Sequence, residues 1–194
     1  MFFHYIHRKA FYNSFMVSHF KKVALGGGCF WCTEAIFKML KGIISVKSGF
    51  AGGNTDNPSY EEVSTGKTNH AEVVYLEYDS DQISFQDILT VFFSSHDPTS
   101  LNRQGNDIGT QYRSIILYET NDQKKEAKEF IKQINSYNPN GAPVVTEVNF
   151  LDKFFEAKLF HQNYYKKNTN DPYCQVIINP KLKHIQKNFI KLLK

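Results

Sequence analysis

The chain has 194 residues, of which 41% are hydrophobic, a length that suffices for one well-buried core and is short for two. Its formal net charge of +4 arises in residues 1–22, which are basic and contain no acid, whereas the remainder holds 19 basic and 19 acidic residues. A neutral body lacks the electrostatic footprint that a phosphate backbone needs, so no nucleic-acid partner is expected.

The sequence also argues against a membrane protein. It has no run of about 18 apolar residues that could span a bilayer, and His4, His7 and Arg8 interrupt any apolar core of an export signal. We therefore expect a cytoplasmic monomer, with residues 1–22 as a flexible basic extension and residues 23–194 as a single domain. Three cysteines, an odd number, favour reduced thiols that do chemistry or bind a metal.

The first predicted elements are a strand, a tight turn and a helix. Residues 23–25 are apolar, residues 26–28 are glycines, and residues 29–41 have helical spacing up to Gly42. A cysteine in the first helical turn meets unpaired amide groups and the positive end of the helix dipole, which favour a thiolate. Cys29 is therefore a candidate nucleophile. Cys32, three residues further on, could trap an oxidised intermediate.

The rest of the chain mixes strands and helices without strict alternation. Further strands are predicted over residues 43–48, 71–78, 113–118 and 144–148, and helices over residues 84–93, 122–134, 151–167 and the last fourteen residues. The final helix is expected to be amphipathic, with its lysines in solvent. Between them, residues 94–111 form a long polar connection of the kind that carries function. This mixture predicts an α+β sandwich.

Other interpretations of the cysteines remain open. Two unreactive cysteines could simply pack in a core. Cys29, Cys32 and Cys174 could bind zinc together with a histidine such as His161, which would make the chain a zinc-stabilised binding module. The CxxC spacing is also typical of general disulfide oxidoreductases. Against zinc, the sequence has no second closely spaced ligand pair, and the aromatic residues between Cys29 and Cys32 suit an apolar pocket better than a zinc knuckle.

Five separated segments resemble the A-type peptide methionine sulfoxide reductases, the family specific for the S epimer of the sulfoxide. The segments, which lie between residues 23 and 180, are GGGCFWCTEAIF, VKSGFAGG, PSYEEVSTGKTNHAEVV, FFSSHDPTSLNRQGNDIGTQYRS and HQNYY. The resemblance implies a two-layer α/β sandwich with a ferredoxin-like βαβ core, and makes residues 23–194 its catalytic domain. It also implies thiol-dependent reduction of methionine S-sulfoxide, free or in proteins, as a repair of oxidative damage.

The resemblance assigns the main chemical roles to four residues. Cys29 would attack the sulfoxide sulfur, and Phe30 and Trp31 would hold the terminal methyl group of the substrate. Glu72 would act as the acid, because a carboxyl that stays protonated in an apolar pocket can give its proton to the departing oxygen. The strand pattern alone would place Glu72 on a solvent-facing surface.

Further substrate contacts follow from the later segments of the resemblance. Tyr112 would donate a hydrogen bond to the sulfoxide oxygen, as an oxyanion hole does, and Asp107 comes from the same segment. His161 and Tyr164 would complete the pocket from one helix face. Residues 158–160 depart from the usual family pattern, which has acidic and aromatic residues there, and this leaves the role of His161 open.

The remaining expectation concerns how the oxidised enzyme is restored. Cys29 would become a sulfenic acid, and a second thiol would condense with it to give a disulfide. We favour Cys174, because Tyr173 fits the family's tail tyrosine near the pocket, while Cys32 could act directly or as a relay. Thioredoxin or a similar dithiol would reduce the disulfide. Neither a cofactor nor a metal is expected.

Overall fold

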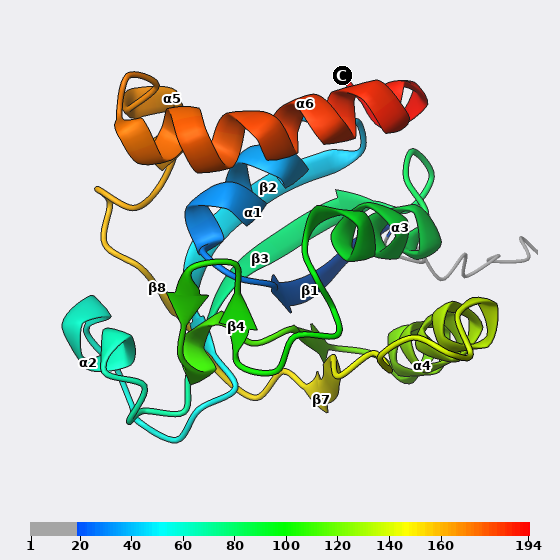
Figure 1. The fold of residues 1–194 in the computed structure, drawn as a ribbon, viewed down its shortest axis with the longest axis horizontal. Helices are drawn as coiled ribbons and strands as arrows, with labels where there is room; N and C mark the ends of the chain where they lie inside the picture. The colour runs from blue at the N-terminus through cyan, green and yellow to red at the C-terminus, as the bar shows by residue number, and fades with distance from the viewer. Residues whose placement is uncertain (1–18) are drawn as a thin grey trace, which may run out of the picture.

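The computed structural model describes residues 19–194, which form a helical layer packed on a curved sheet (Figure 1). In the described residues the sheet has six strands in the order β7-β6-β1-β3-β2-β8. The strands are β1 (Phe20–Gly26), β2 (Ile43–Ala51), β3 (Ala71–Asp79), β6 (Ile115–Tyr118), β7 (Glu147–Phe150) and β8 (Phe154–Glu156). Neighbouring strands are antiparallel, except that β6 and β7 run parallel.

The helices lie mainly on one face of this sheet. They are α1 (Phe30–Lys38), α2 (Tyr60–Ser64), α3 (Phe85–Ser95), α4 (Asn121–Tyr137), α5 (Tyr164–Lys167) and α6 (Asn179–Asn188). Figure 1 shows α6 crossing above α1, with α3 beside them and α4 next to α3 at the edge. Two short strands, β4 (Arg103–Gln104) and β5 (Asp107–Ile108), pair antiparallel as a separate two-stranded ribbon.

The connectivity confirms the predicted sandwich and its ferredoxin-like core. Two strand–helix–strand units, β1-α1-β2 and β3-α3-β6, interleave so that their strands stand in the order β6-β1-β3-β2. Both α1 and α3 therefore pack on the same face. The short link between β1 and α1 places the beginning of α1 at the end of β1, the strand that lies between β6 and β3.

The alternation of side chains along β3 decides where Glu72 lies. Val74 and Leu76 belong to the main core beneath the helices, and Val73 belongs to a smaller cluster on the opposite face. Successive residues of a strand point to opposite faces, so Glu72 shares the helix-covered face with Val74 and Leu76. The solvent-facing position that the strand pattern suggested for Glu72 is therefore wrong.

The predicted helix over residues 151–167 is also wrong. This segment contains β8, which pairs with Gly49–Ala51 of β2, then a turn, and finally the single helical turn of α5. A helix could not run through Asn163, whose φ of 58° lies in the left-handed region. Pairing with the edge of the sheet is a tertiary interaction that the local apolar spacing does not reveal.

Several element boundaries differ from the sequence-based expectations. The first strand begins at Phe20 rather than at residue 23, so residues 20–22 of the expected extension belong to β1, while residues 1–18 lie outside the described residues. The first helix ends at Lys38, and the strand expected over residues 144–148 is found as β7 at Glu147–Phe150. No helix among the described residues is long and apolar enough to cross a membrane.

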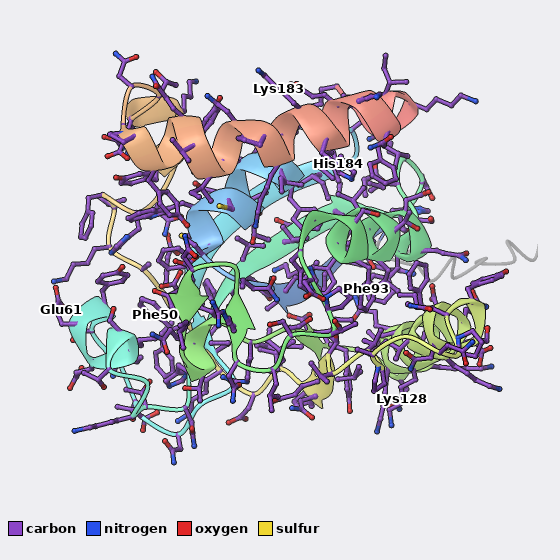
Figure 2. All side chains as sticks on the ribbon, viewed as in Figure 1. Phe50, Glu61, Phe93, Lys128, Lys183 and His184 are labelled. Atoms are coloured by element: carbon purple, nitrogen blue, oxygen red, sulfur yellow. The ribbon has the colours of Figure 1, made fainter. Side chains whose placement is uncertain are left out.

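The amphipathic helix expected at the end of the chain is present as α6. Leu182 and Ile185 are buried against the core, whereas Lys183 and His184 are exposed, and Figure 2 labels both of them on α6. A π-helical turn over Cys174–Ile178 leads directly into α6. Cys174 therefore lies inside the helical segment.

Candidate active site

Cys29 is the residue that immediately precedes α1, and the glycines before it allow a sharp turn. Gly28 has a φ of 93°, a conformation that residues with a side chain rarely adopt. A Cβ on Gly27 would lie 2.9 Å from the ring of His96, so any residue with a side chain would clash with this ring. The turn delivers Cys29 to the N-terminus of α1 with an extended backbone, at φ −60° and ψ 126°.

Glu72 of β3 lies directly at this helix N-terminus. Its Oε2 accepts a hydrogen bond from the backbone N–H of Phe30 over 3.0 Å, and its side chain is buried. Burial raises the pKa of Glu72 to about 8, although the hydrogen bond from Phe30 acts in the opposite direction. A carboxyl with this pKa is protonated at neutral pH and is a proton donor.

The thiol of Cys29 does not have the environment that its place in the sequence suggested. Burial is the largest effect and raises the pKa of Cys29 well above the ordinary value, and the hydrogen bond with Cys32 and the charge of Glu72 add to the rise. The same hydrogen bond, which Cys29 donates, lowers the pKa of Cys32. The expected thiolate at Cys29 is thus not favoured in the resting site, because Glu72 occupies the helix terminus and burial opposes the charge.

A cluster of aromatic side chains surrounds the first turn of α1. The ring of Phe30 is buried and lies 5.7 Å from that of Phe50 and 6.4 Å from that of Tyr60, measured between centroids. The indole of Trp31 stacks on Tyr164, with ring centroids 3.6 Å apart and an angle of 6° between the planes. These aromatic side chains are suited to hold a small apolar group such as the methyl group of a thioether.

His161 packs against this aromatic cluster, and its hydrogen bond with Trp31 selects one tautomer. The indole N–H of Trp31 donates a hydrogen bond to Nδ1 of His161 over 3.2 Å, so the proton of the neutral imidazole is on Nε2. Burial lowers the pKa of His161, which favours this neutral form. Nε2 is buried and has no hydrogen-bond partner among the described residues. Its N–H is therefore a buried donor whose hydrogen bond is not used by the described residues.

Two tyrosines lie within reach of the charge of Glu72. Burial raises the pKa of Tyr112, which lies in the 3₁₀ turn Thr110–Tyr112, and the charge of Glu72 is the next largest cause. The same two causes raise the pKa of Tyr60. Both hydroxyls therefore keep their protons and can donate hydrogen bonds to an oxygen beside Glu72.

Tyr60 was not singled out by the sequence analysis, although it belongs to one of the five recognised segments. It begins α2, whose N-terminus is fixed by reciprocal hydrogen bonds between Ser59 and Glu62. Its ring lies 4.5 Å from that of His161. The signal that could have found it is a tyrosine directly after the first residue of a capping box, in the segment that contains Glu72.

Tyr173 connects the two sides of the site. Its hydroxyl donates a hydrogen bond to Oδ2 of Asp107 over 3.3 Å and lies 3.9 Å from Sγ of Cys32. Burial raises the pKa of Tyr173, and the thiol groups nearby add to the rise. The backbone N–H of Tyr173 donates to Asp171, which fixes the turn before Cys174. Tyr173 thus lies beside Cys32 and connects it to Asp107.

Cys174 is buried and is the first residue of the π-helical turn. Burial raises its pKa, and the charges of Asp171 and Cys32 contribute. The charge of Cys32 thus reaches Cys174, and Cys32 in turn shares a hydrogen bond with Cys29. All three cysteines are free thiols. A hollow of about 550 Å³, lined in part by Asp107, Tyr173 and Lys181, adjoins this group.

The ligand set of the zinc alternative is not assembled. Within residues 19–194, no group of three or more histidine, cysteine, aspartate or glutamate side chains is placed so that it could hold a metal ion. Nδ1 of His161 instead accepts the hydrogen bond from Trp31.

Comparison with known proteins identifies the family. The family model described as peptide methionine sulfoxide reductase matches residues 21–193. The chain belongs to this family. It is 53% identical over 165 residues to the peptide methionine sulfoxide reductase MsrA of Saccharolobus solfataricus. The match covers 85% of this chain and 92% of that protein.

Solved structures agree with this assignment. The methionine sulfoxide reductase A of Corynebacterium diphtheriae is 35% identical and superposes with a TM-score of 0.73, covering 78% of this chain and 76% of that one. Mxr1 from Saccharomyces cerevisiae in complex with Trx2 is 21% identical, with a TM-score of 0.51 and coverage of 75% and 84%, and shares the fold. As a member of the peptide methionine sulfoxide reductase family, the chain is a peptide-methionine (S)-S-oxide reductase.

Proposed function

We propose that this reductase works through a thiol cycle in which Cys29 attacks the sulfur of methionine S-sulfoxide while Glu72 protonates the oxygen. The observation that carries the proposal is the buried carboxyl of Glu72, protonated at neutral pH, at the same helix terminus as Cys29. A bond forms between Sγ of Cys29 and the substrate sulfur as Sγ attacks, and it breaks again as the protonated oxygen moves from the substrate sulfur to Sγ. The proton that the thiol of Cys29 loses restores the carboxyl of Glu72. The products are methionine and a sulfenic acid at Cys29.

The substrate is held by the groups around this pair. Phe30 and Trp31 form the apolar wall that accepts the methyl group, and Tyr164 supports Trp31 from its other side. Tyr112 and Tyr60 donate hydrogen bonds to the oxygen as negative charge develops on it. Nε2 of His161, together with Asp107, contacts the polar part of the substrate. The substrate can be free methionine sulfoxide or a residue of an oxidised protein.

Cys32 is the first resolving thiol in this proposal, and Cys174 is the second. Cys32 attacks the sulfenic sulfur of Cys29, water leaves, and a disulfide forms between them. Only the first turn of α1 must adjust, because residues three apart on a helix have Cβ atoms about 5–6 Å apart, against about 3.8 Å in a disulfide. Cys174 then attacks Cys32 and frees Cys29. The shared hydrogen bond of Cys29 and Cys32 favours this order over direct attack by Cys174.

An external dithiol of the thioredoxin class reduces the final disulfide in this cycle. The hollow beside Tyr173 and Lys181 supports this step, since it leads from the surface towards the segment that carries Cys174. The complex of the similar Mxr1 with Trx2 is a second support. The described site uses residues of one chain, which favours a monomer, and its three free thiols favour a reducing, cytoplasmic compartment.

Turnover of a peptide containing methionine S-sulfoxide, with dithiothreitol as reductant, tests the proposal. We expect the wild-type enzyme to convert the sulfoxide of the peptide to methionine, and Cys29→Ser to convert none. Cys174→Ser should keep activity with dithiothreitol, which can reduce a disulfide between Cys29 and Cys32, and lose most of it with thioredoxin. Equal rates for the wild type and Cys29→Ser would end the proposal.

A further inference from the structure

Glu34 is a buried carboxylate for which the proposed reaction has no use. It lies on α1, one turn beyond Phe30, and its side chain is 1% exposed. Its Oε1 accepts a hydrogen bond from the ammonium of Lys38 over 2.7 Å and another from the backbone N–H of Asn163 over 2.7 Å. A buried charge is costly unless it is paired and hydrogen-bonded, and Glu34 meets both conditions through these two contacts.

Lys38 also contacts Asn163, so Glu34, Lys38 and Asn163 are all joined by hydrogen bonds. Its ammonium also donates to Oδ1 of Asn163 over 2.5 Å. The main chain and the side chain of Asn163 are therefore both held by a pair of charged residues one turn apart on α1. Asn163 has the left-handed conformation, with φ 58° and ψ 33°, and it directly precedes α5. The pair thus fixes the backbone at the point where the chain reverses.

The neighbours of Asn163 explain what this anchor does for the site. On one side, His161 accepts the indole N–H of Trp31, and on the other, Tyr164 stacks on the indole ring. Gln162 fixes the same segment to β2, because its side-chain amide exchanges two hydrogen bonds with the backbone of Ser48. Residues 161–164 are thus held at two points and contact Trp31 with two rings.

We infer that Glu34 is a positioning residue for the methyl-binding pocket, and that it acts with Lys38 through the backbone of Asn163. Its carboxylate sets the position of His161 and Tyr164, and these two rings set the position of Trp31. The inference rests on the proposed role of Trp31 as a wall of that pocket. Glu34 itself transfers no proton and contacts no substrate.

Trp31 supplies a direct readout, because it is the single tryptophan of the sequence. We propose to compare the wild type with Glu34→Ala, Glu34→Gln and Lys38→Met by the emission maximum of Trp31 and by its quenching with acrylamide. Glutamine keeps an oxygen that can accept the N–H of Asn163 but loses the ion pair, and Lys38→Met removes the cation alone. These fluorescence measurements need neither substrate nor turnover.

The expected order of the effects follows from the contacts. Glu34→Ala should shift the emission of Trp31 to longer wavelength and raise KM for methionine S-sulfoxide by about tenfold, with kcat changed much less, because binding of the ground state and of the transition state weakens equally. Glu34→Gln and Lys38→Met should lie between Glu34→Ala and the wild type in both measurements.

A matched control removes an ion pair that does not touch the pocket. Lys47→Met breaks the exposed pair between Lys47 and Glu156, and should leave the emission of Trp31 and KM unchanged. A folded Glu34→Ala enzyme with the emission and KM of the wild type would overturn the inference. If Glu34→Ala does not fold, wild-type quenching of Trp31 in both Glu34→Gln and Lys38→Met would overturn it.

The kinetics also separate a positioning role from a chemical one. If Glu34→Gln lowers kcat as strongly as Glu34→Ala while Trp31 stays unmoved, Glu34 acts on the reaction and the inference is wrong. Failure of the proposed function would look different. Turnover by Cys29→Ser would contradict the roles proposed for the thiols, whereas it would leave the fluorescence changes of the Glu34 variants as they are.

Discussion

The carboxyl group of Glu72 accepts the backbone N–H of Phe30 over 3.0 Å, so the proton donor of the site is fixed to the helix that Cys29 begins. This backbone N–H of Phe30 therefore orients the carboxyl group of Glu72 and is not available to stabilise a thiolate at Cys29. Burial keeps this acid protonated, because it raises the pKa of Glu72 to about 8. The arrangement favours proton delivery to an oxygen over storage of negative charge on sulfur.

The first prediction concerns the pH dependence of catalysis. The rate of methionine release in a single turnover should fall as pH rises through about 8, because Glu72 then loses the proton that the reaction needs. Glu72→Gln should be slower by about 100-fold or more below pH 8 and should lack this fall. Rapid-quench measurements from pH 6 to pH 9.5 would check it, and a Glu72→Gln profile that still falls near pH 8 would contradict the assignment.

The second prediction concerns stability. The pKa of Glu72 is about 8 in the folded protein, against an ordinary value of 4.5, so the folded state binds the extra proton between these values. The contribution of Glu72 to stability is therefore complete below about pH 4.5 and is lost as pH rises to about 8. The free energy of unfolding of Glu72→Gln should rise, relative to that of the wild type, on the order of a few kcal/mol between pH 5 and pH 8.5. Urea unfolding at the two pH values measures this gain, and equal differences at both would argue against the raised pKa.

The third prediction concerns the turn before Cys29. A Cβ on Gly27 would lie 2.9 Å from the ring of His96, and that ring is held by contacts of Nδ1 with the carbonyl oxygen of Phe92 and of Nε2 with Oγ of Ser114. Gly27→Ala should therefore destabilise the protein by about 1–3 kcal/mol. In the double variant with His96→Ala, much of the Gly27→Ala effect should disappear, because the clash is gone. Thermal unfolding of the four proteins completes the cycle, and additive effects would show that the clash is not the cause.

The fourth prediction concerns Tyr173. Tyr173→Phe removes the hydroxyl that donates to Asp107 and lies beside Cys32 but keeps the ring. We expect the first turnover to stay within about threefold of the wild type, because Cys29 and Glu72 are untouched, and recycling by thioredoxin to slow by about tenfold. Steady-state and single-turnover rates measured on the same preparation separate the two effects. A loss confined to the first turnover would place Tyr173 in the substrate pocket instead.

Much of the fold follows from local pattern, because glycines, capping residues and alternating strands each leave a signal. The link from residue 26 to Cys29 and the capping box at Ser84 and Asp87 are local features of this kind. The helix predicted over residues 151–167 was wrong for a physical reason, because β8 forms through its pairing with β2. Pairing between distant strands leaves no local periodicity that could distinguish it from a helix.

The sequence predicted candidate residues for the site, but it did not predict their protonation states correctly. The helix terminus at Cys29 is a local feature, but its effect on the thiol depends on Glu72, which lies 42 residues beyond Phe30 and accepts the backbone N–H of Phe30. Burial of Glu72 likewise depends on which face of β3 the helices cover. Neither effect can be derived from the residues next to Cys29, which is why the expected thiolate was wrong.

The most direct test of the account counts the methionine that each enzyme releases from an excess of methionine S-sulfoxide without any reductant. Transfer of oxidation from Cys29 through Cys32 to Cys174 frees Cys29 for another attack, so the wild type should release about two methionines per chain. Cys32→Ser and Cys174→Ser should each release about one, and Cys29→Ser none. One methionine from the wild type, or any stoichiometric release from Cys29→Ser, would contradict the proposed order of thiols.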